Sequence, residues 1–262
     1  MIRPIIFFCL VFFSLHAVAQ KKVSSREVTD EIVFATVDRV GELYVVTKNG
    51  QIQKFDIDGK LISLYKNVPI PTLFEPRDGS RLFAFFRKDR KIEYLNPSFE
   101  VSTAALIDSA FVIDPWLACS SGDHNIWVLD AEDRTMKKIS PRTSTVEVDV
   151  KYPESLSRNF DNIKFAREYQ GFFFLLDQQN GIHIFNGMGT WTKTIPMQTL
   201  SYFNFLGEEL YYPVGNGLAL VNLFSGEKRE IPLNKSFKFA LLTDERLFLI
   251  QRNSIDFFEF KP

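Results

Sequence analysis

The stretch Leu43-Tyr44-Val45-Val46 is a short apolar strand, and a strand of the same kind returns five more times along the chain. The later copies are Leu82-Phe83-Ala84-Phe85, Ile126-Trp127-Val128-Leu129, Phe172-Phe173-Phe174-Leu175, Leu210-Tyr211-Tyr212 and Leu247-Phe248-Leu249-Ile250. The first residues of these strands are 39, 44, 46, 38 and 37 positions apart, about 41 on average. A period near 40 residues, with several strands in each unit, is typical of a β-propeller built from radial four-stranded blades.

The sequence around the first copy predicts a complete blade. Glu31–Val37 is expected to be the inner strand, followed by strands at Glu42–Thr47, Gln51–Asp56 and Leu61–Tyr65. Asn49-Gly50 is a strong hairpin signal because both residues tolerate positive φ. The next four blades are expected from Thr72 to about Asp108, Phe111 to about Val150, Phe160 to Ile195, and Leu200 to Ile231.

The last repeat is one strand short. Ser236–Leu242, Arg246–Gln251 and Ser254–Phe260 supply three strands, whereas Lys22–Thr29 has no blade of its own. We therefore expect the N-terminal segment to complete the sixth blade, because ring closure removes an open sheet edge. The predicted fold is an all-β, six-bladed β-propeller over residues 20–262, with four-stranded blades and the last blade closed by the N-terminal strand.

Residues 1–19 are predicted to be a signal peptide. Arg3 precedes an apolar run from Ile5 to Leu15, and Ala17-Val18-Ala19 matches a cleavage site. The run of eleven residues is too short to span a bilayer, and no later stretch is long or apolar enough to do so. The mature chain would keep only Cys119, which cannot form an internal disulfide. Export without disulfides fits a bacterial periplasm or cell surface, with peripheral outer-membrane association left open.

Charge and motifs favour binding over catalysis. The mature chain would carry 30 basic and 32 acidic residues, which gives no sign of a nucleic-acid or anionic membrane partner. His124 and His183 are far apart in the repeat, and no Gly-x-Ser-x-Gly motif is present. No catalytic residue is therefore predicted. The large side chains at one repeat position are expected to pack between blades: Trp127, Phe173, Tyr211 and Phe248.

The central tunnel offers a candidate cation site. Oxygen-bearing side chains lie on or near the inner strands of four different blades: Glu75, Asp114, Asn162 and Asn204. Oxygen ligands that converge on an axis suit a hard cation such as calcium, the one cofactor that the sequence leaves open. Six-bladed propellers of the gluconolactonase and paraoxonase type hold calcium in this way, but their local motifs are not recognisable here. A calcium-dependent hydrolase or lactonase at the tunnel is thus one alternative function.

A second candidate is a surface for a protein partner. In propellers the hairpins between second and third strands share a face with the connections between blades. The second blade presents Arg87, Lys88 and Arg90 there, and the long connection Lys151–Asp161 adds Tyr152 and Arg158. Because recognition concentrates on loops held by a rigid scaffold, we predict that this face binds an envelope protein.

Trp191 supports another alternative, a carbohydrate-binding propeller. It follows Gly189-Thr190, and aromatic side chains at loop tips suit sugar faces. A packing role at the start of a strand is the other interpretation of this residue.

The first blade carries a resemblance to a known group. Its run from Gly41 to Val46, followed by Asn49–Asp56 and Asp58-Gly59-Lys60, resembles the repeats of NHL-like six-bladed propellers. The leader ending Ala17-Val18-Ala19-Gln20 looks like those of exported Bacteroidota proteins. The resemblance implies a propeller fold and an exported compartment. An interaction or scaffold module of the cell envelope is the leading hypothesis, because a propeller fold alone does not specify an activity.

Overall fold

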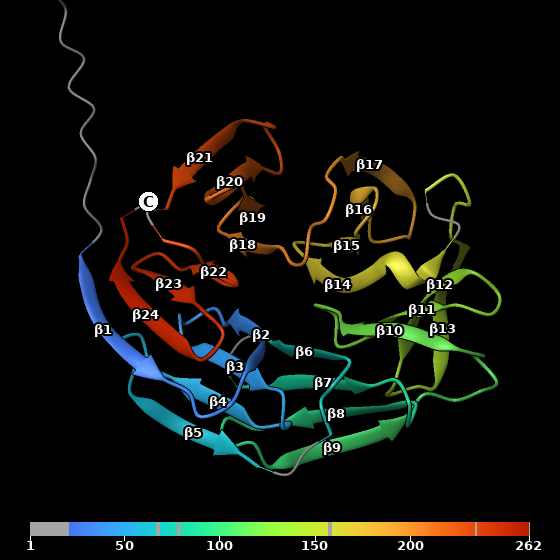
Figure 1. Ribbon diagram of the computed structural model, residues 1–262. Helices are drawn as coiled ribbons and strands as arrows, with labels where there is room; N and C mark the ends of the chain where they lie inside the picture. The colour runs from blue at the N-terminus through green and yellow to red at the C-terminus, as the bar shows by residue number, and fades with distance from the viewer. Residues whose placement is uncertain (1–20, 67–68, 78–79, 157–158, 234, 262) are drawn as a thin grey trace, which may run out of the picture.

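The computed structural model describes residues 21–66, 69–77, 80–156, 159–233 and 235–261. Within these residues the chain forms six antiparallel sheets of four strands each, arranged around a central axis (Figure 1). The structure therefore confirms the predicted six-bladed β-propeller. The predicted signal peptide, residues 1–19, lies outside the described residues.

Each of the first five blades is built from four consecutive strands, numbered from the axis outward. Blade 1 holds β2 (Ile32–Val37), β3 (Leu43–Thr47), β4 (Ile52–Phe55) and β5 (Leu61–Tyr65); blade 2 holds β6 (Leu73–Pro76), β7 (Leu82–Phe86), β8 (Lys91–Leu95) and β9 (Val101–Leu106). Blade 3 holds β10 (Pro115–Ser120), β11 (Ile126–Asp130), β12 (Thr135–Ser140) and β13 (Thr145–Lys151). Blade 4 holds β14 (Ile163–Tyr169), β15 (Phe172–Asp177), β16 (Gly181–Phe185) and β17 (Trp191–Ile195); blade 5 holds β18 (Asn204–Leu206), β19 (Glu209–Val214), β20 (Gly217–Asn222) and β21 (Lys228–Pro232).

Aromatic side chains fill the space between blades, as the repeat position predicted. Trp127 of blade 3 stacks on Phe173 of blade 4, with ring centroids 5.0 Å apart. Trp127, Phe173, Tyr211 and Phe248 are all at most 1% exposed. Every residue of the second strands β3, β7 and β11 is buried, so both faces of these strands are covered and buried positions do not alternate with exposed ones. Cys119 is also fully buried, and burial raises the pKa of its thiol well above the usual range.

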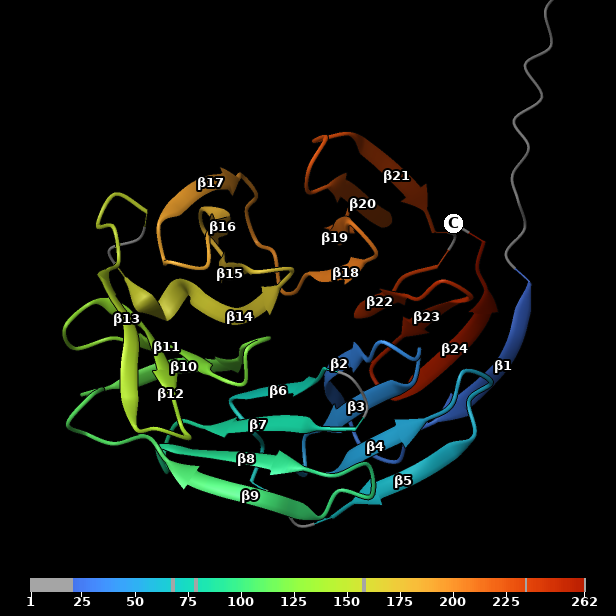
Figure 2. The same cartoon turned by 180° about the vertical axis from the view of Figure 1, so that it is seen from behind.

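The N-terminal strand closes the ring. β1 (Lys22–Glu27) pairs with β24 (Ser254–Glu259), which continues through β23 (Arg246–Ile250) to β22 (Phe239–Leu242). Figures 1 and 2 show β1 lying along the outside of β24 from both sides. The expected closure of the sixth blade is thus confirmed. No helix in the described part of the chain is long and apolar enough to cross a membrane.

The start of the fourth blade differs from the expectation. Phe160–Asn162 forms a short 3-10 helix, η1, and the inner strand begins only at Ile163. The side chain of Asn159 accepts a hydrogen bond from the Asp161 amide and so caps this turn. The Asn162 side chain therefore lies ahead of the strand.

Candidate functional site at the tunnel mouth

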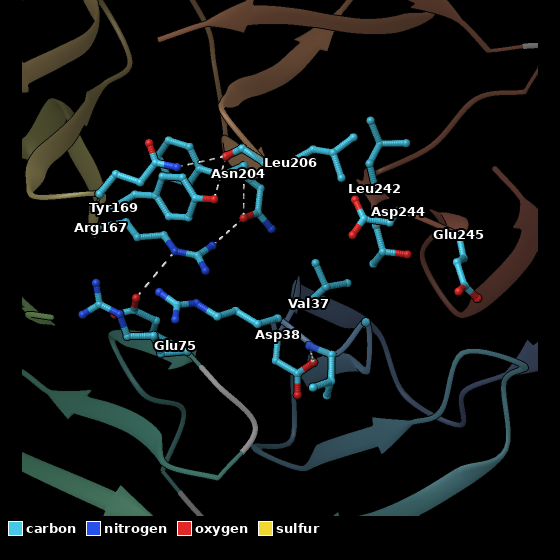
Figure 3. A pocket seen from close by; sticks show the side chains of 18 of the residues that line it. Val37, Asp38, Glu75, Arg167, Tyr169, Asn204, Leu206, Leu242, Asp244 and Glu245 are labelled. Atoms are coloured by element: carbon cyan, nitrogen blue, oxygen red, sulfur yellow. Dashed lines mark hydrogen bonds and ion pairs between the residues drawn. The ribbon is translucent and has the colours of Figure 1, made fainter. Parts of the chain in front are cut away.

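A cavity of about 600 Å³ opens at one end of the tunnel, on the face of the hairpins between first and second strands (Figure 3). The hairpin that follows β2 contributes Val37–Gly41, and the hairpin that follows β22 contributes Leu242–Glu245. The ends of β6, β14 and β18 supply the remaining polar groups. Residues of five blades thus converge here, because every inner strand runs towards this face before it turns.

One carboxylate holds three blades together beneath the mouth. Glu168 of β14 accepts hydrogen bonds from the Gly122 amide at 2.8 Å, the Trp127 indole at 3.0 Å and the Ser121 hydroxyl. Its other contact is with the Arg77 guanidinium, 3.4 Å from Oε1. Glu168 is 6% exposed, so a buried charge is matched by several donors, as a stable interior requires.

A second buried pair is much less complete. Nη1 of Arg167 donates to Oδ1 of Asn204, whereas Nε lies 3.5 Å from Oε1 of Glu75, beyond the usual hydrogen-bond range. Both atoms of this long contact are buried, and neither has a hydrogen-bond partner among the described residues. The other Glu75 oxygen accepts from the Ser120 hydroxyl at 2.8 Å. In Figure 3 the Arg167 guanidinium faces the open middle of the cavity.

The rim of the mouth is acidic. Asp38 lies in the blade 1 hairpin, where its carboxylate accepts from the Val40 and Glu42 amides and the Tyr44 hydroxyl. Burial raises the pKa of Asp38 to about 6. Asp244 and Glu245 are exposed on the side of the cavity away from Arg167 (Figure 3).

The formal charge of the lining follows from its titratable side chains. Five carboxylates line the cavity, Asp38, Glu75, Glu168, Asp244 and Glu245, against the three arginines Arg39, Arg77 and Arg167. The lining therefore carries a formal charge of −2 when every group is ionised. The deep arginines Arg77 and Arg167 are balanced by Glu168 and Glu75. The net negative charge comes from Asp38, Asp244 and Glu245, which outnumber the exposed Arg39.

The structure brings together two of the four predicted cation ligands. Glu75 and Asn204 line the cavity, and both contact the Arg167 guanidinium. Asp114 and Asn162 lie just before β10 and β14. They are therefore at the start of their inner strands, at the end of the tunnel away from this cavity. Within the described ranges, no group of three or more His, Cys, Asp or Glu side chains is placed to hold a metal. Calcium binding stays a prediction.

The predicted binding residues of blade 2 lie on the opposite face, in the β7–β8 hairpin. Arg87 forms an ion pair with Asp114 at 3.1 Å, and its guanidinium lies 3.7 Å from the centroid of the Trp116 ring. Arg90 donates to the carbonyl oxygens of Val112 and Ile113. Both arginines thus join blade 2 to blade 3, and only Lys88 of the three is exposed.

The connection into blade 4 also includes a predicted binding residue that is buried in the core. Tyr152 is 2% exposed and packs edge-on against Phe160, with ring centroids 5.3 Å apart. Arg158 lies outside the described residues. Trp191 begins β17, the outer strand of blade 4, and is 46% exposed. Binding at any of these positions stays a prediction.

Sequence reasoning missed Arg77, Arg167 and Glu168. The available signal was the pair Arg167-Glu168, which follows Phe165-Ala166 and puts two charges inside an inner strand. Successive strand residues point to opposite faces. Arg167 accordingly contacts Asn204 of blade 5, and Glu168 contacts the β10–β11 hairpin of blade 3.

Comparison with known proteins shows the fold and no family. No protein-family model matches the sequence, and no curated protein is detectably similar to it. The chain is similar in structure to virginiamycin B lyase from Staphylococcus aureus, with a TM-score of 0.58 and 12% identity over 90% of this chain and 98% of the lyase. The Neurospora crassa Pan2 WD40 domain gives a TM-score of 0.57 and 10% identity over 93% of this chain and 96% of that domain.

A third similar structure is the extracellular domain of a putative hybrid two-component system from B. thetaiotaomicron. It gives a TM-score of 0.54 and 13% identity over 86% of this chain but 33% of the other. All three likenesses are at low identity, so they demonstrate a shared propeller architecture alone.

Proposed function

We propose that this protein is an exported recognition propeller that binds a polypeptide partner in the cell envelope, with the tunnel mouth as its binding site. One observation carries the proposal. Residues from five blades form a cavity of about 600 Å³, and its floor holds a buried arginine with incompletely matched donors. Concave sites with a few convergent polar groups on a rigid scaffold are the usual places for recognition.

The composition of the lining supports binding. Its described residues supply the hydroxyl groups of Tyr169 and Thr243 besides five carboxylates and three arginines. One structure of virginiamycin B lyase is a catalytically inactive form in which a histidine is replaced by alanine. The carboxylates, guanidinium groups, amides and hydroxyls of this mouth are suited to holding a ligand by charge and hydrogen bonds.

The compartment in the proposal rests on the sequence. Residues 1–19 have the charged start, apolar run and small-residue end of a signal peptide. Cys119 is buried and forms no disulfide, so packing and the closing strand hold the described blades together.

Site-specific photo-crosslinking in cells that export the protein tests the proposal. The reactive residue is placed at Val40, which is 65% exposed and lines the cavity, or at Lys88 on the opposite face as the matched control. We expect a discrete protein adduct from position 40 that is lost when Arg167→Met is added. An adduct from position 88 alone would place the partner on the other face and overturn the assignment.

A further inference from the structure

The donors of Arg167 indicate what the site binds. A guanidinium group has five N–H donors and no acceptor. Asn204 accepts one hydrogen bond, and Glu75 is the sole other polar partner found in the described residues, 3.5 Å from Nε. The Arg167 side chain is only 9% exposed, its Nε is buried without a hydrogen-bond partner among the described residues, and the group lines the cavity. An arginine placed in this way can donate to oxygen acceptors of a ligand that enters the cavity.

The charge of the mouth selects among the anions that could supply those oxygens. A phosphate brings nearly two negative charges, and it would pass the exposed carboxylates of Asp244 and Glu245 at the rim. A single carboxylate brings only one negative charge. Its two oxygens also match the planar fork of a guanidinium group. The lining, with a formal charge of −2, favours a monoanion that is accompanied by a basic group.

We propose that the tunnel mouth binds the C-terminal carboxylate of its polypeptide partner at Arg167, with a basic residue close to that terminus lying against Asp244 and Glu245. The inference rests on the proposed function and names the part of the partner that enters. Asn204 positions the guanidinium group, because its side-chain oxygen accepts from Nη1. The same oxygen of Asn204 accepts from the Phe205 amide, and Asn204 lies opposite the buried Tyr211 in the pairing of β18 with β19, which connects this support to the core of blade 5.

The test uses two pools of synthetic hexapeptides with a lysine three residues from the C-terminus, one ending in a free carboxylate and the other in a carboxamide. The mature protein is equilibrated with each pool by dialysis, and bound peptides are quantified by mass spectrometry. We expect the free acids to be retained at least about tenfold better than the amides, equivalent to about 1.4 kcal/mol.

Variants separate recognition from folding. Arg167→Met removes the donors, and the double variant Glu75→Gln/Arg167→Met removes both charges of the buried pair, which proteins often tolerate. Both should abolish the preference for free acids. Arg87→Met, at the other end of the tunnel, is the matched control and should retain it. Asp244→Asn/Glu245→Gln alters exposed side chains and should weaken retention of both lysine-bearing pools while the preference for free acids is kept.

Three outcomes would overturn the inference. Equal retention of acids and amides would exclude carboxylate recognition, while a Val40 adduct would still support a partner at the mouth. Retention of neither pool, together with that adduct, would likewise remove the C-terminus and leave the proposed function standing. Binding of free lysine as tight as that of the hexapeptides would assign the site to amino acids in place of a polypeptide.

Discussion

The closing blade and the tunnel mouth both join segments that are distant in sequence by means of charged side chains, and they do so differently. At the closure, Asp256 of β24 pairs with Lys22 at 2.6 Å and Lys235 at 2.9 Å, and it accepts from Ser25. At the mouth, Arg167 approaches Glu75 only to 3.5 Å. The contacts that close the ring are short and partly exposed to water, whereas the pair at the mouth is buried and incomplete. Incomplete pairing at a cavity costs stability and is typical of functional sites.

Removal of the closing strand should have the largest effect. A chain that begins at residue 30 lacks β1 and leaves the edge of β24 open. We expect a loss of about 5 kcal/mol or more from the free energy of unfolding, a large part of the total for a domain. Urea unfolding of residues 20–262 and 30–262 measures the difference. An unchanged midpoint would show that β1 contributes pairing without stability.

Trp127→Ala should have the second largest effect on stability, because this residue supports the mouth from below. The variant loses the stacking on Phe173 and one of the donors to Glu168. We expect a loss of about 3–5 kcal/mol from the free energy of unfolding. Trp191→Ala is the matched control on an exposed tryptophan, expected to change stability by no more than about 0.5 kcal/mol. Similar losses in the two variants would contradict the burial described for blade 3.

The stability that Asp256 gives to the closing blade should be lost in acid. Hydrogen bonds from Lys22, Ser25 and Lys235 outweigh partial burial and lower the pKa of Asp256 to about 2. An acid with a lowered pKa contributes stability that is fully present above its unfolded value of 3.8 and is lost as the pH falls towards 2. Asp256→Asn should cost about 1–2 kcal/mol at pH 7, reduced by the exposure of both lysines. A variant whose deficit is as large at pH 2 as at pH 7 would contradict this account.

At the mouth, Asp38 should give stability the opposite dependence on pH. The folded protein holds the Asp38 proton up to about pH 6, whereas the ordinary carboxyl loses it near 3.8, so stability falls as the pH rises through that window. Asp38→Asn should raise stability at pH 7 by about 1 kcal/mol and flatten this dependence. Asn96 and Asn186 accept the same two backbone hydrogen bonds in equivalent turns, so asparagine fits the conformation.

Asp56→Asn is the matched control for that variant. Asp56 makes the same turn as Asp38, away from the cavity, by accepting from the Asp58 and Lys60 amides. We expect it to change stability by no more than about 0.5 kcal/mol at any pH. Destabilisation by Asp38→Asn at pH 7 would show that the hydrogen bonds at this carboxylate outweigh its burial.

The sequence predicts the scaffold because the scaffold repeats. The six apolar strands recur at nearly constant spacing, and Lys22–Thr29 is identified as the closing strand because no blade accounts for it. The mouth does not repeat. Whether an inner-strand residue reaches it depends on which end of the strand it occupies, and a one-residue change of register exchanges its two faces.

The four predicted oxygen ligands illustrate that limit. Glu75 lies near the end of β6, whereas Asp114 and Asn162 precede their strands and so lie at the other end of the tunnel. Composition alone does not distinguish these positions. It also gives no sign that Arg167, two blades away from Glu75 in sequence order, lies beside that carboxylate.

The smallest expected effect is that of calcium. A bound ion would raise the stability of the folded state by mass action, about 2.7 kcal/mol at a hundredfold excess over its dissociation constant. At the mouth, however, Glu75 and Asn204 both direct an oxygen at the Arg167 guanidinium, which repels a cation from the place where those oxygens converge. We therefore expect the thermal midpoint of the mature protein to be the same in excess calcium and in a chelator. A rise in the thermal midpoint with calcium that is lost in Glu75→Gln would contradict this expectation. The incomplete pair of Glu75 and Arg167 would then be a cation site, and Arg167 would have to move to admit the ion.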